Sequence, residues 1–209
     1  MICVDVHLHT RFSFDASISP KYVADALNAH PVIKGVAITD HNTLEGYGHV
    51  RRFAAAYPEV VVIPGVEVGT MLGDVIVLGV TEKPAYWSSL ESVVDFAKAR
   101  NGVLVVPHPY RGGGIRDAAK KIPYGLGAVE VLNPDSTDEE NKMADTLAKT
   151  INLPGVGGSD AHHIHQMWKA YTEIDAEPNV DSILKAIKNN RVKPVLVKHD
   201  LNSGSASYL

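Results

Sequence analysis

The stretch ICVDVHLHTRFSFDASISPKYVADALNA, residues 2–29, decides the fold class because it holds one complete strand-to-helix unit. Its first part, Ile2–His7, is short, mostly apolar and rich in β-branched residues, as a buried strand should be. Its last part, Pro20–Ala29, has apolar residues at helical spacing, and Ser19 directly before Pro20 is a helix-start signal. The stretch predicts a β-strand followed by an α-helix.

The same alternation continues along almost the whole chain. Short apolar runs predict further strands at Val32–Thr39, Val60–Pro64, Asp74–Val80, Gly102–Val106, Ala128–Leu132, Leu153–Gly157, Tyr171–Ile174 and Pro194–Val197. Amphipathic segments between them predict helices at Glu45–Ala56, Ser88–Arg100, Glu139–Thr150 and Val180–Asn189. The chain is therefore predicted to be α/β. Such βα units close into a barrel or open into a doubly wound sheet, and periodicity alone does not choose between them.

Composition limits the class of protein. The 209 residues are 45% hydrophobic and 21% charged, which is the balance of one large globular domain and excludes disordered and fibrous proteins. No linker, repeat or low-complexity segment divides the chain. We expect one domain over residues 1–201, followed by a short polar tail, NSGSASYL, over residues 202–209.

Charge and cysteine content indicate the compartment and the partners. Twenty Lys and Arg stand against 24 Asp and Glu, with the signs interspersed, so a broad basic surface for nucleic acid is not favoured, although a local basic pocket stays open. Cys3 is the only cysteine, which excludes an intrachain disulfide and a thiolate zinc cluster and predicts a reducing compartment, the cytoplasm. We expect no membrane segment, because no signal peptide pattern or apolar run approaching ~20 residues is present.

Two histidines occupy alternate positions at the first predicted strand, Asp5-Val6-His7-Leu8-His9. Because side chains alternate along a strand, His7 and His9 project from the same face. Two imidazoles at this spacing on a rigid strand can bind one divalent ion. A pair of surface histidines is the simpler alternative, so further ligands are needed to indicate a metal site.

Further polar residues follow the later strands where each strand ends. In a parallel sheet or barrel, the carboxyl ends of the strands lie at one end, so we expect these side chains to converge. Imidazoles mixed with carboxylates suit Zn²⁺, Mn²⁺ or Fe²⁺ better than Ca²⁺ or Mg²⁺. The pattern predicts a metal centre there. The residues concerned are Asp40, His41, Glu67, His108, Asp160, His162 and His163.

A set of short motifs, in this order, resembles the PHP (polymerase and histidinol phosphatase) family. The motifs are HLHT at His7–Thr10, Asp15 before Pro20, ITDHNT at Ile38–Thr43, PGVEV at Pro64–Val68, PHPY at Pro107–Tyr110, GGSDAHH at Gly157–His163 and AYTEID at Ala170–Asp175. The resemblance covers about Met1 to Ile174. It implies a distorted (β/α)7 TIM-like barrel that hydrolyses phosphate esters with two or three divalent metal ions (Mn, Zn or Fe) bound at its C-terminal mouth.

The resemblance also implies the metal ligands. In nucleotide-directed members a further histidine completes the third set, but Ile76 stands at that position here. The third ion would then be weakly bound, completed by water or phosphate, or held by another group such as Glu130. The implied sets are His7, His9, Asp160 and a bridging Glu67 for one ion, Asp15, His41 and His162 for a second, and Glu67 and His108 for a third.

The expected chemistry is in-line attack on phosphorus by a metal-activated water, with no side-chain nucleophile. Asp40, His163 or an ordered water would protonate the leaving oxygen, and spacing does not rank them. Asp40 is alternatively a carboxylate that orients a ligand imidazole.

The glycine-rich segment after His108 offers positive groups for a substrate phosphate. In Arg111-Gly112-Gly113-Gly114-Ile115-Arg116, glycines let backbone amides approach an anion, and Arg111 and Arg116 can bind it. The three glycines also suggest a mobile lid over residues 111–114, while a flexible loop with solvated arginines is the alternative. Arg11, just after HLHT, is a further candidate.

These features predict a stand-alone metal-dependent phosphoesterase that acts on a small phosphorylated metabolite or nucleotide. An exonuclease-type 3'-5' phosphodiesterase is an alternative within catalysis, although the chain has no basic groove. A catalytically inactive barrel that serves as a binding or scaffold subunit is an alternative of another class. Such a scaffold has no physical reason to keep unpaired carboxylates and imidazoles together, because burying them is costly. The sequence leaves the oligomeric state open.

Overall fold

A computed structural model describes residues 1–85, 88–112, 114–115, 117, 125–199 and 206–208. Its strands are β1 (Ile2–Leu8), β2 (Ile33–Ile38), β3 (Val61–Thr70), β4 (Gly73–Leu78), β5 (Val103–Val106), β6 (Leu126–Leu132), β7 (Gly155–Gly157), β8 (Ala170–Ile174), β9 (Val192–His199) and β10 (Ala206–Tyr208). Its helices are α1 (Pro20–Ala29), α2 (Glu45–Ala54), α3 (Leu90–Ala99), α5 (Asp138–Thr150), α6 (Val180–Lys188) and the 3-10 helix η1 (Ile164–Gln166).

All strands and helices predicted from the sequence are present, most with ends shifted by a few residues. Helix α1 spans Pro20–Ala29 as predicted, and the Ser19 side chain accepts a hydrogen bond from the amide of Tyr22. The predicted helix start at Ser88 is wrong: the Ser89 side chain accepts a hydrogen bond from the amide of Ser92, so α3 begins at Leu90. A capping side chain one residue later fixes the first turn of this helix.

The strands form one mixed sheet in the order β10-β9-β8-β1-β2-β3-β4-β5-β6-β7. Strands β1, β2 and β3 are parallel to one another, as are β5, β6 and β7, while β4 runs antiparallel between β3 and β5. Only Met71 and Leu72 separate β3 from β4, and so short a connection allows only an antiparallel hairpin. The six strands β1, β2, β3, β5, β6 and β7 therefore all point toward one end of the barrel.

The barrel closes where the segment after β7 meets β1. After β7 the chain returns to β1, where Leu8 and Ala161 form a parallel bridge. The amide of Asp160 donates to the carbonyl of His7 at 2.7 Å, and the amide of His9 donates to the carbonyl of Ala161 at 3.0 Å. The predicted distorted (β/α)7 barrel is confirmed as a mixed α/β, nearly closed barrel, and β4 and β8 are the strands that distort it.

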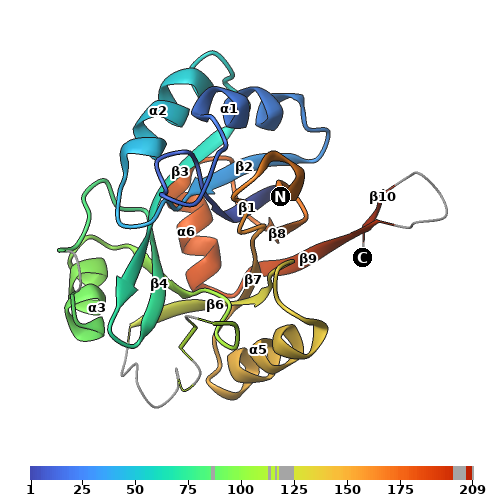
Figure 1. The fold of residues 1–209 in the computed structure, drawn as a ribbon. Coiled ribbons are helices and arrows are strands. Elements are labelled where there is room, and N and C mark those ends of the chain that lie inside the picture. The colour runs from blue at the N-terminus through green and yellow to red at the C-terminus, as the bar shows by residue number, and fades with distance from the viewer. Residues whose placement is uncertain (86–87, 113, 116, 118–124, 200–205, 209) are drawn as a thin grey trace.

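Helix α6 packs against the amino-terminal end of the barrel. Its buried residues Ile183, Leu184 and Ile187 share a core cluster with Val4 of β1 and Ile63 of β3. In the view of Figure 1, α6 is seen within the outline of the strands, α1, α2, α3 and α5 lie around the outside, and β9 and β10 extend away from the body. The opposite, carboxyl-terminal end is thus left for polar side chains. None of the helices in the described ranges is long and apolar enough to cross a membrane.

Candidate metal centre

The carboxyl-terminal ends of the barrel strands bring all eight predicted metal ligands together. His7 lies near the end of β1 and Glu67 near the end of β3, and His9 follows β1 directly. Asp15 lies on the loop between β1 and α1, and the others lie within a few residues of the ends of β2, β5 and β7. The four side chains at the centre, those of His7, His9, Glu67 and Asp160, are each at most 2% exposed. The eight residues are His7, His9, Asp15, His41, Glu67, His108, Asp160 and His162; we call them the mouth cluster.

Two carboxylates connect the buried imidazoles. Oε2 of Glu67 lies 3.3 Å from His7 Nε2, 3.1 Å from His9 Nε2 and 3.3 Å from His41 Nδ1. Oδ1 of Asp160 lies 3.2 Å from His7 Nε2 and 3.3 Å from His9 Nε2. One acidic oxygen thus faces several nitrogen ligands at once, which is the arrangement of a site that shares carboxylates between cations.

The remaining members of the mouth cluster lie on two sides of this centre. Toward solvent, Oδ2 of Asp15 is 3.4 Å from His41 Nε2 and 3.5 Å from His162 Nε2. On the other side, Nε2 of His108 is 3.5 Å from Glu67 Oε1. Ligand atoms of His9, His41 and His162, of His7, His108 and Asp160, and of His7, His9 and Glu67 each lie within 4.8 Å of one another. Adjoining ligand groups of this kind are consistent with a multinuclear metal site.

Two unpaired polar atoms show that these donors suit a cation. Glu67 Oε1 and His108 Nδ1 are buried and have no hydrogen-bond partner among the described residues. Buried polar groups are almost always paired, and mixed nitrogen and carboxylate donors suit Zn²⁺, Mn²⁺ or Fe²⁺. The residues present therefore fit divalent metal ions.

In the absence of metal, the buried charges compensate one another. Burial raises the pKa of the Glu67 carboxyl, but the positive charge of His7 and the contacts with His108, His7 and His9 together outweigh burial and hold that pKa well below its usual range. For His9, a basic group, burial lowers the pKa, but its contacts with Asp160 and Glu67 raise that pKa to about 9. Burial also lowers the pKa of His7, but Asp160, Glu130 and Glu67 raise it well above its usual value.

Glu130 is buried and contacts two residues of the mouth cluster, His7 and His108. Its Oε1 lies 3.0 Å from His7 Nδ1, and its Oε2 accepts hydrogen bonds from the His108 amide and the Asn133 side chain, each at 2.9 Å. Both oxygens are therefore occupied, which gives Glu130 the role of orienting His7 rather than completing a third ligand set. Ile76, opposite Glu67 in the β3–β4 pair, adds only a buried apolar side chain.

Asp40 has a comparable supporting position. Its Oδ1 accepts hydrogen bonds from the Thr10 amide at 2.6 Å and the Ser13 hydroxyl at 2.8 Å, and its Oδ2 accepts from the Thr10 hydroxyl at 2.7 Å. Ser13 Oγ in turn lies 2.9 Å from His9 Nδ1. A side chain at Gly46 would place its Cβ 1.9 Å from Asp40 Oδ2, so α2 needs glycine at this point. Asp40 thus orients His9 through Ser13.

The other predicted site residues have mixed positions. The Arg111 guanidinium forms a short ion pair with Asp160 Oδ2 and donates to Asn133 Oδ1 at 3.2 Å, so Arg111 reaches the mouth cluster. His163 is exposed and its Nδ1 lies 2.9 Å from Ser17 Oγ, outside the mouth cluster. Arg11 is exposed, with its guanidinium 5.9 Å from the Phe12 ring. Arg116, and part of the predicted lid at 111–114, lie outside the described residues.

Asp5 is a buried carboxyl beneath the mouth cluster, and no sequence motif indicates a site role for it. Its Oδ1 accepts hydrogen bonds from the Ser159 amide at 2.9 Å and the His7 amide at 3.3 Å, while Oδ2 has no partner among the described residues. Burial raises the pKa of Asp5 to about 7, although its hydrogen bonds with Ser159 oppose the shift. The folded protein thus holds a proton on Asp5 more tightly than the unfolded chain.

This raised pKa predicts a pH-dependent effect of Asp5→Asn in chelator-treated protein. The stabilisation by protonated Asp5 is complete below its ordinary pKa of 3.8 and is lost as the pH rises through about 7. Relative to the wild type, Asp5→Asn should gain about 2–3 kcal/mol of stability between about pH 5 and pH 8. Urea unfolding at both pH values measures the difference. If the stability difference between Asp5→Asn and the wild type is the same at both pH values, Asp5 does not change its protonation between them.

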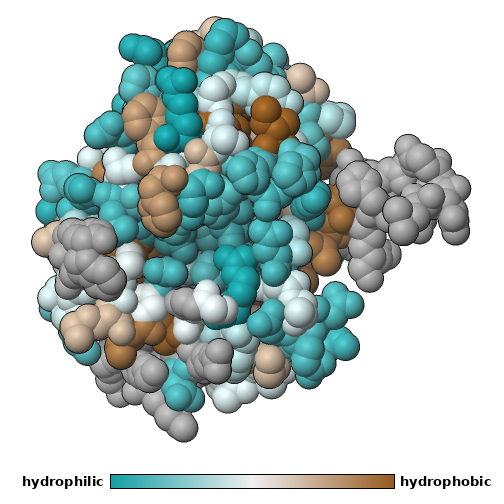
Figure 2. Space-filling view, in the orientation of Figure 1, coloured by the Kyte–Doolittle hydropathy of each residue, from teal (hydrophilic) through white to brown (hydrophobic). Residues whose placement is uncertain are grey.

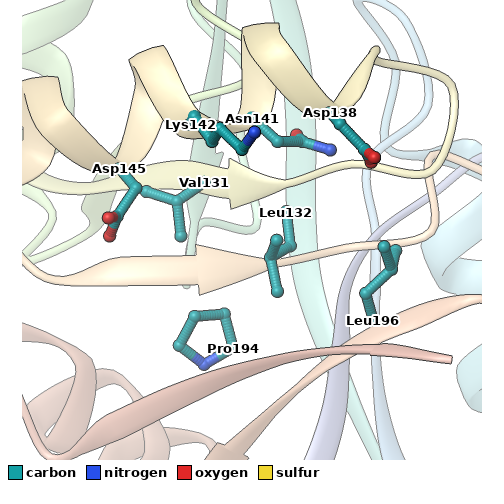
Figure 3. A pocket seen from close by; sticks show the side chains of 8 residues that line it. All are labelled: Val131, Leu132, Asp138, Asn141, Lys142, Asp145, Pro194 and Leu196. Atoms are coloured by element: carbon teal, nitrogen blue, oxygen red, sulfur yellow. The ribbon is translucent and has the colours of Figure 1, made fainter. Parts of the chain in front are cut away.

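A separate groove lies on the outside of the barrel. It has a volume of about 450 Å³ between α5 and the strands β6 and β9, with Leu132, Pro194 and Leu196 on one side and Asp138, Lys142 and Asp145 on the other (Figure 3). None of its lining residues belongs to a possible metal-binding group in the described chain. The mouth cluster is therefore the candidate functional site.

Known proteins resemble this chain in sequence. Residues 138–192 match a family model described as PHP-associated. An uncharacterized protein of Methanocaldococcus jannaschii is 33% identical over 138 residues, which cover 62% of this chain and 80% of that protein.

Two solved structures show the same fold at low sequence identity. A two-domain protein of Bacteroides vulgatus containing a predicted PHP-like metal-dependent phosphoesterase has a TM-score of 0.76 at 18% identity, over 92% of this chain and 64% of that one. An amidohydrolase of Chromobacterium violaceum has a TM-score of 0.61 at 18% identity, over 77% of this chain and 88% of that one. The chain thus spans less than two thirds of the Bacteroides protein.

Proposed function

The chain belongs to the PHP family, and from this premise we propose that it hydrolyses phosphate esters with two or three divalent metal ions bound at the mouth of its barrel. The observation that carries the proposal is the mouth cluster itself. Three groups of ligand atoms each lie within 4.8 Å of one another: the group of His7, His9 and Glu67 shares His9 with a second group and His7 with a third, and the third contains the other carboxylate, Asp160. A small phosphorylated metabolite or nucleotide is favoured over a polymer, because 20 Lys and Arg interspersed with 24 Asp and Glu offer no broad basic surface for a polymer's phosphates.

The ligand sets follow from these contacts. His7, His9, Glu67 and Asp160 would hold one ion, and Asp15, His41 and His162 a second. Glu67 and His108 would hold a third if water or phosphate completes its coordination. Such ions, when bound, supply Lewis acidity and lower the pKa of a bound water.

Arg111 is the residue of this chain best placed to bind the substrate's phosphate. Its guanidinium is partly exposed, with 26% of the side chain accessible, and it already contacts Asp160 at the cluster. It can therefore orient an anionic oxygen there through two parallel hydrogen bonds. Arg11, which is exposed, and Arg116, on the same loop as Arg111, stay candidates for further contacts with the phosphate.

Proton transfer to the leaving oxygen needs a group that is free to donate. Asp40 accepts three hydrogen bonds and serves as an orienting residue. His163 follows His162 directly and stays a candidate proton donor, and it would have to turn from Ser17, which its Nδ1 contacts at 2.9 Å outside the mouth cluster.

Replacing Arg111 should weaken substrate binding more than it slows the chemistry. We expect Arg111→Ala to raise KM by about 10–100-fold, because a charge-assisted, bidentate contact is lost. Arg111→Lys should recover only part of the loss, since an ammonium cannot make both bonds. Arg51→Ala, which removes an exposed arginine from α2, is the matched control. An unchanged kcat/KM in Arg111→Ala would remove Arg111 from the site.

The function is tested by a panel of phosphomonoesters, phosphodiesters and short single-stranded DNA, with Mn²⁺, Zn²⁺ and Fe²⁺ added in turn. The proposal predicts turnover of at least one class of phosphate ester that stops when a chelator is added. Hydrolysis of DNA in preference to small esters would favour the exonuclease alternative. Absence of turnover with every ion and ester would favour the scaffold alternative.

A further inference from the structure

Asn133, the first residue after β6, connects two buried carboxylates, those of Glu130 and Asp160. Its Nδ2 donates hydrogen bonds to Glu130 Oε2 at 2.9 Å and to Asp160 Oδ2 at 3.2 Å. Its Oδ1 accepts hydrogen bonds from Arg111 Nη1 at 3.2 Å and from the Asp135 amide at 2.9 Å. An asparagine side chain has two N–H donors and two acceptor lone pairs, so this buried side chain uses all four. A side-chain amide is therefore the group that fits this position.

This one amide orients a predicted metal ligand and also the residue that orients another. Asp160 Oδ1 lies 3.2 Å from His7 Nε2 and 3.3 Å from His9 Nε2. Asp160 Oδ2 is the oxygen that Asn133 holds. Glu130 Oε1 lies 3.0 Å from His7 Nδ1, and Asn133 holds the other Glu130 oxygen. Loss of the amide would take a donor from both buried carboxylates at once, so the geometry of the mouth cluster depends on where Asn133 lies.

Asn141, on α5, fixes Asn133 through the main chain. Asn141 Oδ1 accepts a hydrogen bond from the Asn133 amide at 3.1 Å, and Asn141 Nδ2 donates to the Asn133 carbonyl at 3.0 Å. Asn141 is buried and lies one turn after Thr137, whose side chain caps α5. Side chains in a helix lean toward its amino terminus, which brings the Asn141 amide back to the end of β6. One side chain thus pairs both main-chain groups of Asn133.

The second asparagine belongs to a helix on the outside of the barrel. Figure 3 shows Asn141 on the side of α5 that faces the strands. Figure 2 shows mostly hydrophilic side chains over the outer surface of this helix, which lies at the lower right in Figure 1. Hydrogen bonds lead from this outer helix to Asn133 and from Asn133 to Asp160. The position of α5 is therefore connected to the mouth cluster through two asparagines.

We propose that Asn133 and Asn141 are positioning residues of the metal centre. Asn133 holds Asp160 by Oδ2, which keeps Oδ1 beside the His7 imidazole. Asn141 keeps Asn133 in place from α5. Their role depends on the metal ions of the proposed function and not on which ester is hydrolysed. Groups that orient metal ligands change metal affinity by about 10–100-fold, so the two asparagines set how tightly the mouth cluster binds its ions.

Calorimetric titration of chelator-treated protein with Mn²⁺ or Zn²⁺ alone measures this role without any substrate. We expect the metal Kd to rise about 10–100-fold in Asn133→Ala and about tenfold in Asn141→Ala. Asn179→Ala is the matched control, because the Asn179 side chain accepts a hydrogen bond from the Ser182 amide at 2.9 Å and caps α6, at the opposite end of the barrel. This control should lose stability in urea, as Asn141→Ala does, but keep the wild-type metal Kd.

The double variant Asn133→Ala/Asn141→Ala separates positioning from two independent structural effects. Because Asn141 acts through Asn133, the double variant should bind metal as weakly as Asn133→Ala does, to within about twofold. Two independent effects on the metal Kd would instead multiply.

The outcomes for this inference and for the proposed function differ. An unchanged metal Kd in folded Asn133→Ala, or a double variant whose effect is the product of the single effects, would overturn the positioning role and leave the proposed function intact. If Asn133→Ala does not fold, equal metal Kd values for Asn141→Ala and Asn179→Ala would overturn it. Metal binding in the expected order, by protein that hydrolyses no phosphate ester, would overturn the proposed function alone.

Discussion

Asp160→Asn should lower kcat/KM for the best phosphate ester by about a thousandfold or more while the fold stays intact. Asp160 Oδ1 lies 3.2 Å from His7 Nε2 and 3.3 Å from His9 Nε2, and the side chain is almost fully buried. The substitution removes one negative charge from the centre of the mouth cluster, where a bound cation is worth several kcal/mol of transition-state stabilisation. About 4 kcal/mol corresponds to roughly a thousandfold in rate.

Asparagine is the right replacement for this position. Asp160 has a φ of +50°, and asparagine adopts this left-handed conformation more readily than most residues do. Asp145→Asn, on the exposed face of α5 where Asp145 pairs with Lys149, is the matched control and should keep full activity. Steady-state kinetics and far-UV circular dichroism measure activity and folding. If Asp160→Asn is folded and keeps more than a third of wild-type kcat/KM, Asp160 is not a metal ligand.

Removal and return of metal should produce the second large effect. Chelator-treated protein should be inactive, because the proposed hydrolysis depends on a metal-activated water, and adding Mn²⁺, Zn²⁺ or Fe²⁺ should restore turnover. A ligand present at about a thousand times its Kd stabilises the folded state by about 4 kcal/mol. For a domain of this length that corresponds to a rise in Tm of roughly ten degrees.

The metal effect has an internal control. In Asp160→Asn the same additions should raise Tm much less than in the wild type, because one ligand of the mouth cluster is missing. Differential scanning fluorimetry of both proteins, with and without each ion, gives the comparison. A wild-type Tm that no ion changes would contradict the assignment of this cluster as a metal centre.

Local periodicity was sufficient to place the elements of the barrel. Helix α1 has the predicted bounds because Ser19, Pro20 and the apolar spacing all act within one segment. The direction of β4 was not predictable in the same way, since it follows from the short β3–β4 turn and from pairing with β5. The start of α3 was predicted too early because Ser88 and Ser89 are adjacent and both are of a type that caps helices, and Ser89 is the one that caps α3.

The site was predictable where strand ends carry the chemistry. His41, Glu67, His108 and Asp160 come together because six strands point the same way, whatever the loops between them do. The supporting residues Ser13, Asn133 and Asp5 escaped notice because a hydroxyl, an amide or a single carboxyl has no distinctive spacing in sequence. Their roles depend on contacts across the barrel, such as the bond between Asn133 Nδ2 and Glu130 Oε2.

The most direct measurement is the metal content per chain of protein purified without chelator, determined by elemental analysis and repeated on Asp160→Asn. The mouth cluster predicts two or three divalent ions per wild-type chain, Mn, Zn or Fe, and at least one fewer in the variant. Fewer than one ion per wild-type chain, with none taken up from added Mn²⁺, Zn²⁺ or Fe²⁺, would contradict the metal centre and with it the proposed hydrolysis of phosphate esters.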